Sequence, residues 1–230
     1  MLSLTKPNFQ PTSAYFYPSM ILYDYFRSSA AYRVRIALNL KQLSVEQRPI
    51  HLGENENRLP DYKAINAQGL VPYLVDGSVS LSQSLAIIEY LNDLYPQPPL
   101  LPDAPAERAW VRSLALTIAC DIHPLNNKRV LDYLVQDLQL KEEQKNSWYR
   151  HWIAEGFDAL EKMLTSRGAS AFCFGNLPTL ADVCLVPQVA NALRFKCAMS
   201  GYPRVMKIYE RCMTLEAFDV AQPSKQADAQ

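Results

Sequence analysis

Residues 21–38 constrain the fold more than any other stretch of this chain. The first six, Ile-Leu-Tyr-Asp-Tyr-Phe, are apolar and aromatic, which is typical of a short buried strand. From Ser29 to Lys41 the pattern becomes that of an amphipathic helix, and Ser28 and Ser29 stand where its N-cap hydroxyl belongs. Three apolar residues are expected on one face of this helix: Val34, Ala37 and Leu38. The chain is therefore predicted to begin its fold with a strand that leads directly into a capped helix.

The N-terminus of that helix is a candidate site for an anion. Free backbone N–H groups and the helix dipole both favour negative charge there, and Ser28 and Ser29 add two hydroxyl donors. The anion that suits this place is a thiolate that the protein does not itself supply. The alternative, that Ser28 only caps the helix, is the commoner arrangement for a serine at such a position.

The rest of the N-terminal half continues as alternating strands and helices. Residues 45–52 alternate like a strand, residues 62–66 form a short helical piece, and residues 82–91 form a helix. Residues 69–81 indicate two strands around a tight Asp-Gly turn. The expected order is β-α-β-α-β-β-α, in which the first two strands are parallel and the last two form an antiparallel hairpin.

Pro72 opens the first strand of that hairpin. Proline removes a donor from the strand ladder, so it belongs at an edge or a bend. A cis bond after Val71 would turn the Val71 backbone toward an open face, where an extended peptide can pair with it. An ordinary trans proline at an edge strand is the alternative, and it is the commoner one.

The sequence of the C-terminal half predicts helices and no strand. The proline-rich residues 95–105 indicate a linker, and two helical patterns follow at 106–119 and 148–164. Thr179 and Asp182 form a capping box that opens a helix ending near Arg194, and a last helix covers residues 203–213. We expect an irregular leader over residues 1–19, one domain over 20–101 and an all-helical domain over 102–230. Met20 can itself be the initiator.

Residues 120–129 interrupt the helical pattern at Pro124. The segment gathers four polar or basic residues in one irregular turn: His123, Asn127, Lys128 and Arg129. The alternative is that this segment is a kink exposed to solvent, in which the single histidine has no function. No metal site is expected here, because the other two histidines lie far away in the sequence.

Composition excludes several classes of protein. The 23 Lys and Arg residues balance 23 Asp and Glu residues, which argues against a nucleic-acid-binding surface. No apolar run approaches the ~20 residues that a membrane-spanning helix needs. The five cysteines are scattered, without a CxxC pair or metal spacing, so free thiols in a reducing cytoplasm are expected.

Three features together resemble the thioredoxin-like domain of cytosolic glutathione transferases: the strand-serine-helix unit, Val71-Pro72, and Gln83-Ser84 before a helix. The Arg27-Ser28-Ser29 run followed by residues 32–38 is similar to the zeta class in particular. That class usually has a cysteine after the two serines, where this chain has Ala30. The resemblance covers nearly all of residues 21–223. It implies an α+β thioredoxin-like N-terminal domain, an all-α C-terminal domain and a homodimer.

The resemblance also implies the site residues. Ser28, Ser29 and Arg27 are the expected catalytic residues, with Ser28 donating a hydrogen bond to the thiolate of glutathione, the expected cofactor. Glutathione itself is expected to contact these residues: Ser28, Ser29, Ala30, Ala31, Tyr32, Arg33, Asn57, Val71, Pro72, Gln83, Ser84, His123, Asn127, Lys128 and Arg129. The substrate is expected to contact Arg27, Lys128 and Arg194, and the guanidinium groups of the two arginines can hold carboxylates bidentately.

The activity that the resemblance implies is a glutathione-dependent cis–trans isomerisation of a small cis-enedioic acid. The first expectation is conversion of maleylacetoacetate to fumarylacetoacetate in tyrosine and phenylalanine catabolism, and the second is isomerisation of maleylpyruvate. A general transferase that conjugates apolar electrophiles is a third possibility, which an apolar cleft would favour and a basic cleft would not. A non-catalytic binding protein on the same fold is a fourth.

Overall fold

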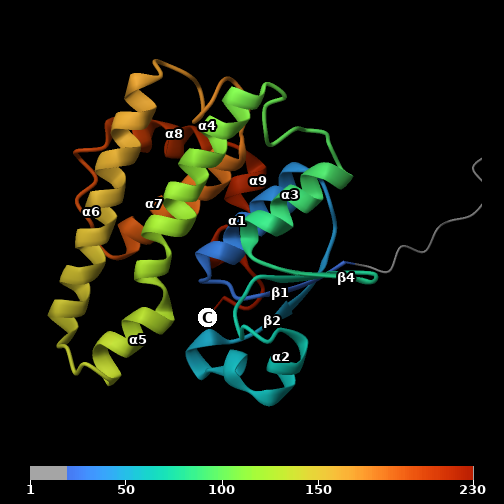
Figure 1. The fold of residues 1–230 in the computed structure, drawn as a ribbon, viewed down its shortest axis with the longest axis vertical. Coiled ribbons are helices and arrows are strands. Elements are labelled where there is room, and N and C mark those ends of the chain that lie inside the picture. The colour runs from blue at the N-terminus through green and yellow to red at the C-terminus, as the bar shows by residue number, and fades with distance from the viewer. Residues whose placement is uncertain (1–19, 230) are drawn as a thin grey trace, which may run out of the picture.

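The computed structural model of this protein describes residues 20–229, which fold into a small sheet with helices and a larger group of helices beside it (Figure 1). The leader predicted for residues 1–19 lies outside the described residues. The proposed domain boundary at residues 101 and 102 falls in the loop between helices α3 (Ser84–Leu94) and α4 (Pro105–Leu116).

The sheet contains the predicted parallel pair and the predicted antiparallel hairpin. Its strands lie in the order β2-β1-β3-β4, with β1 and β2 parallel and the other pairs antiparallel. The strands are β1 (Ile21–Asp24), β2 (Glu46–Pro49), β3 (Tyr73–Asp76) and β4 (Val79–Ser82). The expected Asp76-Gly77 turn joins β3 to β4, and Gly77 adopts a φ of 58°, which a residue without a side chain tolerates best.

Helices cover both faces of this sheet. Figure 1 shows α1 and α3 on one side and α2 on the other, as the alternation of side chains requires. Leu22 of β1 and its partner Leu74 of β3 are fully buried toward α1 and α3. Tyr23, the next residue of β1, packs on the opposite face against Tyr62 of α2. The three helices are α1 (Ser29–Leu40), α2 (Pro60–Ile65) and α3 (Ser84–Leu94).

Two local expectations need correction. The strand predicted over 45–52 is limited to Glu46–Pro49, and all four of its side chains are exposed, because β2 is an edge strand. Helix α1 is buried on nearly all sides rather than on one face, because it lies between the sheet and the helices of the C-terminal half.

The described part of the chain after residue 102 contains helices and turns but no strand. Its helices are α4 (Pro105–Leu116), α5 (Lys128–Gln136), α6 (Glu142–Ser166), α7 (Leu180–Arg194), α8 (Pro203–Met213) and α9 (Glu216–Asp219). Helices α4, α6, α7 and α8 were predicted, whereas α5 and α9 were not. Where Pro124 was expected to break a helix, α4 passes into a π-helical turn at Thr117–Ile122 and then a 3-10 turn at Pro124–Asn126.

Helix α7 is the centre of the C-terminal half. Its predicted capping box is present: the Asp182 carboxylate accepts hydrogen bonds from the Thr179 backbone N–H and hydroxyl, both at 2.8 Å. The same carboxylate accepts a bond from the Cys173 N–H at 2.7 Å. Helix α7 packs against α1, α4 and α8, so one hydrophobic core joins the sheet side to the helical side.

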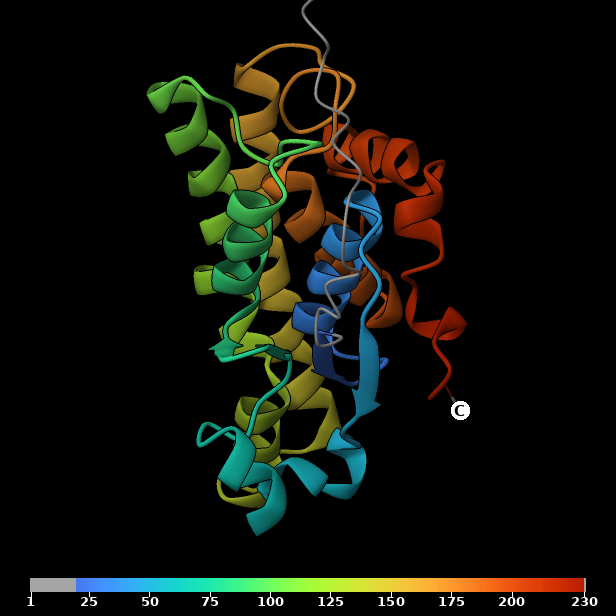
Figure 2. The same cartoon turned by 90° about the vertical axis from the view of Figure 1, so that its right-hand side faces the viewer.

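The C-terminal segment returns along α1 toward the end of β1 (Figure 2). The Arg35 guanidinium donates to the Ala221 carbonyl at 3.1 Å, and the Asp228 carboxylate accepts from the Phe26 N–H at 3.0 Å. The last residues are therefore fastened to the turn between β1 and α1. No helix in the described residues is long and apolar enough to cross a membrane.

Candidate active site

A cleft of about 770 Å³ lies between the β1–α1 turn, the loop before β3, and helices α5 to α7. This volume is within the range of ordinary small-molecule sites. Both serines at the start of α1 line it, together with residues from the distant turn that follows the π-helical segment. The cleft therefore lies at the helix N-terminus that the sequence singled out.

Ser28 caps helix α1, as predicted. Its backbone is extended, with φ −70° and ψ 114°, and its Oγ accepts a hydrogen bond from the Ala31 N–H at 3.2 Å. This bond uses the oxygen of the hydroxyl and leaves its proton free to donate. Ser28 is partly exposed in the cleft, so capping and anion binding are compatible functions of the same side chain.

A buried ion pair between Arg35 and Asp24 stabilises the turn that carries Arg27. Arg35 Nη1 lies 2.8 Å and 2.9 Å from the two carboxylate oxygens of Asp24, and both side chains are nearly inaccessible. The same guanidinium donates to the Phe26 carbonyl at 3.1 Å. Because Arg35 binds the backbone on the N-terminal side of Arg27, it fixes the place from which the exposed Arg27 side chain enters the cleft.

Ser29 makes a hydrogen bond across the two halves of the molecule. Its Oγ lies 3.1 Å from His123 Nδ1, and Asn127 Nδ2 lies 3.5 Å from His123 Nε2. Burial, reinforced by the cations Arg33 and Arg129, lowers the pKa of His123 to about 3. His123 is therefore neutral at physiological pH. It is hydrogen-bonded to Ser29 and faces Asn127, so the expectation of a solvated histidine at a kink was wrong.

The electrostatics of the cleft favour an anionic ligand. Seven basic and two acidic side chains line it: Arg27, Arg58, Lys63, Lys128, Arg129, Lys145 and Arg194, with Asp132 and Glu142. Asp132 already accepts from Lys128 at 2.6 Å and from Arg58 at 3.4 Å, and Glu142 pairs with Lys145. Arg27, Arg129 and Arg194 have no ion pair within the described residues 20–229, so they are available for carboxylates.

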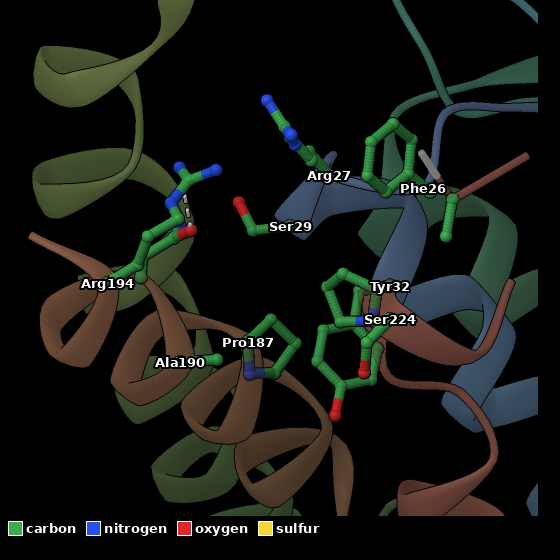
Figure 3. A pocket seen from close by; sticks show the side chains of 11 residues that line it. Phe26, Arg27, Ser29, Tyr32, Pro187, Ala190, Arg194 and Ser224 are labelled. Carbon is green, nitrogen blue, oxygen red and sulfur yellow. Dashed lines mark hydrogen bonds between the residues drawn. The ribbon is translucent and has the colours of Figure 1, made fainter.

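A smaller cavity of about 390 Å³ opens beside the cleft and shares Arg27, Ser29, Asn191 and Arg194 with it (Figure 3). Figure 3 shows Arg27 and Arg194 on opposite sides of an opening, with the Ser29 hydroxyl directed into the space between them. The wall of this cavity is largely apolar, formed by Phe26, Tyr32, Pro187 and Ala190, and Ser224 of the C-terminal segment closes one side. The arrangement suits a small molecule with an apolar body and negative ends.

Most of the predicted site residues lie at these cavities. The cleft is lined by Arg27, Ser28, Ser29, Asn57, Val71, His123, Asn127, Lys128, Arg129 and Arg194, and the smaller cavity by Tyr32. The Val71–Pro72 bond is cis, and the Val71 backbone makes no hydrogen bond to any described residue. Asn57 donates to the Gly69 carbonyl at 2.7 Å, which holds the loop that leads to Val71.

Six predicted residues line neither cavity: Ala30, Ala31, Arg33, Pro72, Gln83 and Ser84. Arg33 is a residue of α1 whose side chain is almost fully buried, and its Nη1 donates to the Ser84 Oγ at 3.3 Å. Gln83 is exposed before α3 with a φ of 72°, and its side chain donates to Gln68 at 3.3 Å. Gln68 does line the cleft, so Gln83 reaches its edge indirectly. The ligand contacts of these residues stay predictions.

Sequence reasoning missed two buried amides in the cleft. Gln188 of α7 is 1 % exposed, and neither its Nε2 nor its Oε1 has a hydrogen-bond partner among the described residues. Asn126 donates to the Tyr149 carbonyl at 3.2 Å, but its Oδ1 has no such partner. A signal was present for Gln188, because Gln188, Asn191 and Arg194 share one face of an otherwise apolar helix.

Nearly the whole chain is similar to proteins of known family. Residues 22–99 match the glutathione S-transferase N-terminal domain family, and residues 147–211 match the glutathione S-transferase C-terminal domain family. The chain is 53 % identical over 213 residues to a probable maleylacetoacetate isomerase of Vibrio cholerae, covering 92 % of this chain and 99 % of that protein.

Two solved structures are also similar. One is the holo structure of a maleylpyruvate isomerase described as a bacterial zeta-class glutathione S-transferase, with a TM-score of 0.90 and 44 % identity, covering 91 % of this chain and 100 % of that one. The other is a maleylacetoacetate isomerase of Methylobacterium extorquens with bound malonate and glutathione. It has a TM-score of 0.89 and 39 % identity, covering 91 % of this chain and 99 % of that one.

Proposed function

Since this chain belongs to the glutathione S-transferase family, we propose that it is a glutathione-dependent isomerase that converts maleylacetoacetate to fumarylacetoacetate. The single observation that carries the proposal is the opening shown in Figure 3, where Arg27 and Arg194 flank the hydroxyl of Ser29. Two guanidinium groups facing one hydroxyl suit a dicarboxylic substrate beside a bound thiolate.

The cleft fits glutathione, which is a tripeptide with two carboxylates and a thiol. The cleft offers arginines that form no ion pair within residues 20–229, which suit the carboxylates, and a Val71 backbone that makes no hydrogen bond to those residues, which suits an extended peptide. The orphaned carboxamide of Gln188 is a further sign of a polar ligand, because buried polar groups are seldom left without partners. When bound, glutathione supplies a thiolate whose reversible addition to an activated double bond permits rotation about that bond.

The residues of this chain then bind, orient and polarise. The Ser28 hydroxyl donates a hydrogen bond to the sulfur at the positive end of α1, and this bond stabilises the thiolate while the proton stays on the serine. Arg27 and Arg194 hold the substrate carboxylates. Phe26, Tyr32, Pro187 and Ala190 surround the apolar part of the substrate and exclude water from it.

Maleylpyruvate is the second candidate substrate. The observation that favours it is the TM-score of 0.90 to the maleylpyruvate isomerase described above. A general transferase for apolar electrophiles fits less well, because basic side chains outnumber acidic ones in the cleft. The proposal further includes a homodimer in the cytoplasm, with the resemblance to cytosolic transferases and the scattered free cysteines in support.

The decisive experiment measures isomerisation of maleylacetone, maleylacetoacetate and maleylpyruvate by the purified protein, with and without glutathione. We expect turnover that requires glutathione and leaves its concentration unchanged. Steady consumption of glutathione with an apolar electrophile, and no isomerisation, would instead identify a conjugating transferase. Equilibrium sedimentation of the same sample tests the homodimer.

A further inference from the structure

The amide of Asn127 has only one orientation that satisfies its surroundings. Asn127 is the N-cap of α5, and its Oδ1 accepts a hydrogen bond from the Arg129 N–H at 3.2 Å. With Oδ1 committed to the cap, Nδ2 is the atom that faces His123 Nε2 at 3.5 Å. An amide nitrogen can only donate, so Nε2 of His123 must act as the acceptor.

This contact determines where the histidine carries its proton. A neutral imidazole has one N–H, and when Nε2 accepts, that proton resides on Nδ1. Nδ1 then donates to the Ser29 Oγ at 3.1 Å. The cations that act on the imidazole, Arg33 from α1 and Arg129 from α5, disfavour a second proton on the ring.

The Ser29 hydroxyl is therefore an acceptor toward His123, and its own proton has no acceptor among the described residues. Ser29 is the serine that lines both cavities, and its hydroxyl points between Arg27 and Arg194. Ser28 is arranged in a parallel way, because its oxygen accepts from the Ala31 N–H and its proton has no acceptor in the described part of the chain. Each serine thus has its acceptor function used by the protein and its donor function left over.

We propose that Asn127 and His123 act as positioning residues that turn the Ser29 hydroxyl toward the sulfur of bound glutathione, as a second donor beside Ser28. The inference rests on the proposed function, since it requires a bound thiol. The thiol proton leaves to solvent, and His123 gains none. Arg27 and Arg194 also face this space and contribute positive charge, so the hydroxyls are not alone in favouring the thiolate.

The first test is the tautomer of His123 in the free protein. Nitrogen chemical shifts from a histidine-labelled sample distinguish a proton on Nδ1 from a proton on Nε2. We expect the Nδ1–H form throughout the neutral pH range. An Nε2–H form, or a protonated ring at neutral pH, would overturn the proposal without any variant having to fold.

The second test titrates the ultraviolet thiolate band of glutathione bound to the enzyme, with no substrate present. Ser29→Ala and His123→Ala should each raise the pKa of the bound thiol by about one, a tenfold loss of thiolate. The double variant should show the same rise and not the sum, because His123 acts through Ser29. Ser28→Ala and Ser29→Ala should add, because they are separate donors.

Two further variants sharpen the titration. His123→Asn retains a donor close to the Nδ1 position and should restore a large part of the lowered thiol pKa. His151 is an exposed histidine of α6, so His151→Ala is the matched control and should leave the thiol pKa unchanged. If wild-type protein binds glutathione without lowering its thiol pKa, the proposed function fails as well. If it lowers the thiol pKa and the His123 variants do so equally, only the positioning role is overturned.

Discussion

The side chain of Ile122 fills the space in which a Cβ on Gly156 would stand. Its Cδ1 and Cγ1 atoms lie 2.2 Å and 2.3 Å from that position. Ile122 ends the π-helical turn that precedes His123, and Gly156 lies inside α6. A glycine in a helix costs about 1 kcal/mol relative to alanine, so its presence here indicates that close packing of the turn requires it.

Gly156→Ala should therefore destabilise the protein despite its better helix propensity. We expect a loss of about 1–2 kcal/mol in the free energy of unfolding, because Ile122 is fully buried and has to be displaced. Turnover should fall as well, since the displaced turn carries His123. Urea denaturation measures the first effect, and Gly201→Ala is the control, because a Cβ there meets nothing within 4 Å. Equal stability of the two variants would contradict this view of Gly156.

The arginines at the opening should separate substrate binding from glutathione binding. Arg27→Ala should raise the substrate KM about tenfold to about a hundredfold, which corresponds to one lost charge-assisted hydrogen bond, and leave the glutathione Kd nearly unchanged. Arg194→Ala should behave in the same way. Steady-state kinetics measures the substrate KM, and calorimetry measures the glutathione Kd. Arg150→Ala, at an exposed position of α6, is the control. A parallel loss of both affinities would discredit the assignment.

The lowered pKa of His123 should make the free energy of unfolding depend on pH. Its pKa is lowered to about 3 in the folded protein from an ordinary value near 6.5, so below the ordinary value the unfolded chain binds the extra proton. The contribution of the neutral His123 to the free energy of unfolding is then complete above about pH 6.5, and it decreases as the pH falls toward 3. Between pH 7 and pH 5 the expected loss is about 2 kcal/mol. Urea denaturation at several pH values measures this loss in the free energy of unfolding. The loss should occur in wild type and in the His151→Asn control, and it should be absent in His123→Asn.

Gln188 should stabilise a ligand complex at the expense of the free protein. Its carboxamide is buried without a partner in the described residues, so Gln188→Met should raise the free energy of unfolding by about 1 kcal/mol. The same variant should bind substrate or glutathione more weakly, because the methionine offers no comparable donor or acceptor. Thermal unfolding and ligand titration test the two effects. A variant that is less stable and equally active would show that Gln188 has only a packing role.

Features with local signals could be predicted well. The cap at Ser28, the capping box of Thr179 and Asp182, and the Asp76-Gly77 turn depend on hydrogen bonds or backbone angles within a few residues. Helix α5 was missed although Asn127 caps it, because Pro124 and the polar residues beside it indicated an irregular turn. The edge strand β2 was predicted too long, because the alternation of residues 45–52 continues beyond its pairing with β1.

The amino-acid sequence by itself determined the order of strands and helices in the N-terminal half and the serine-capped start of α1, since these follow from interactions between near neighbours in the chain. Only the tertiary structure decided which side chains share a cavity. It buried Arg33 away from both cavities and brought Gln188 and Asn126 to the cleft that Ser29 also lines. The physical reason is that α1 packs directly on α7, a helix far along the chain, and no local pattern encodes that contact.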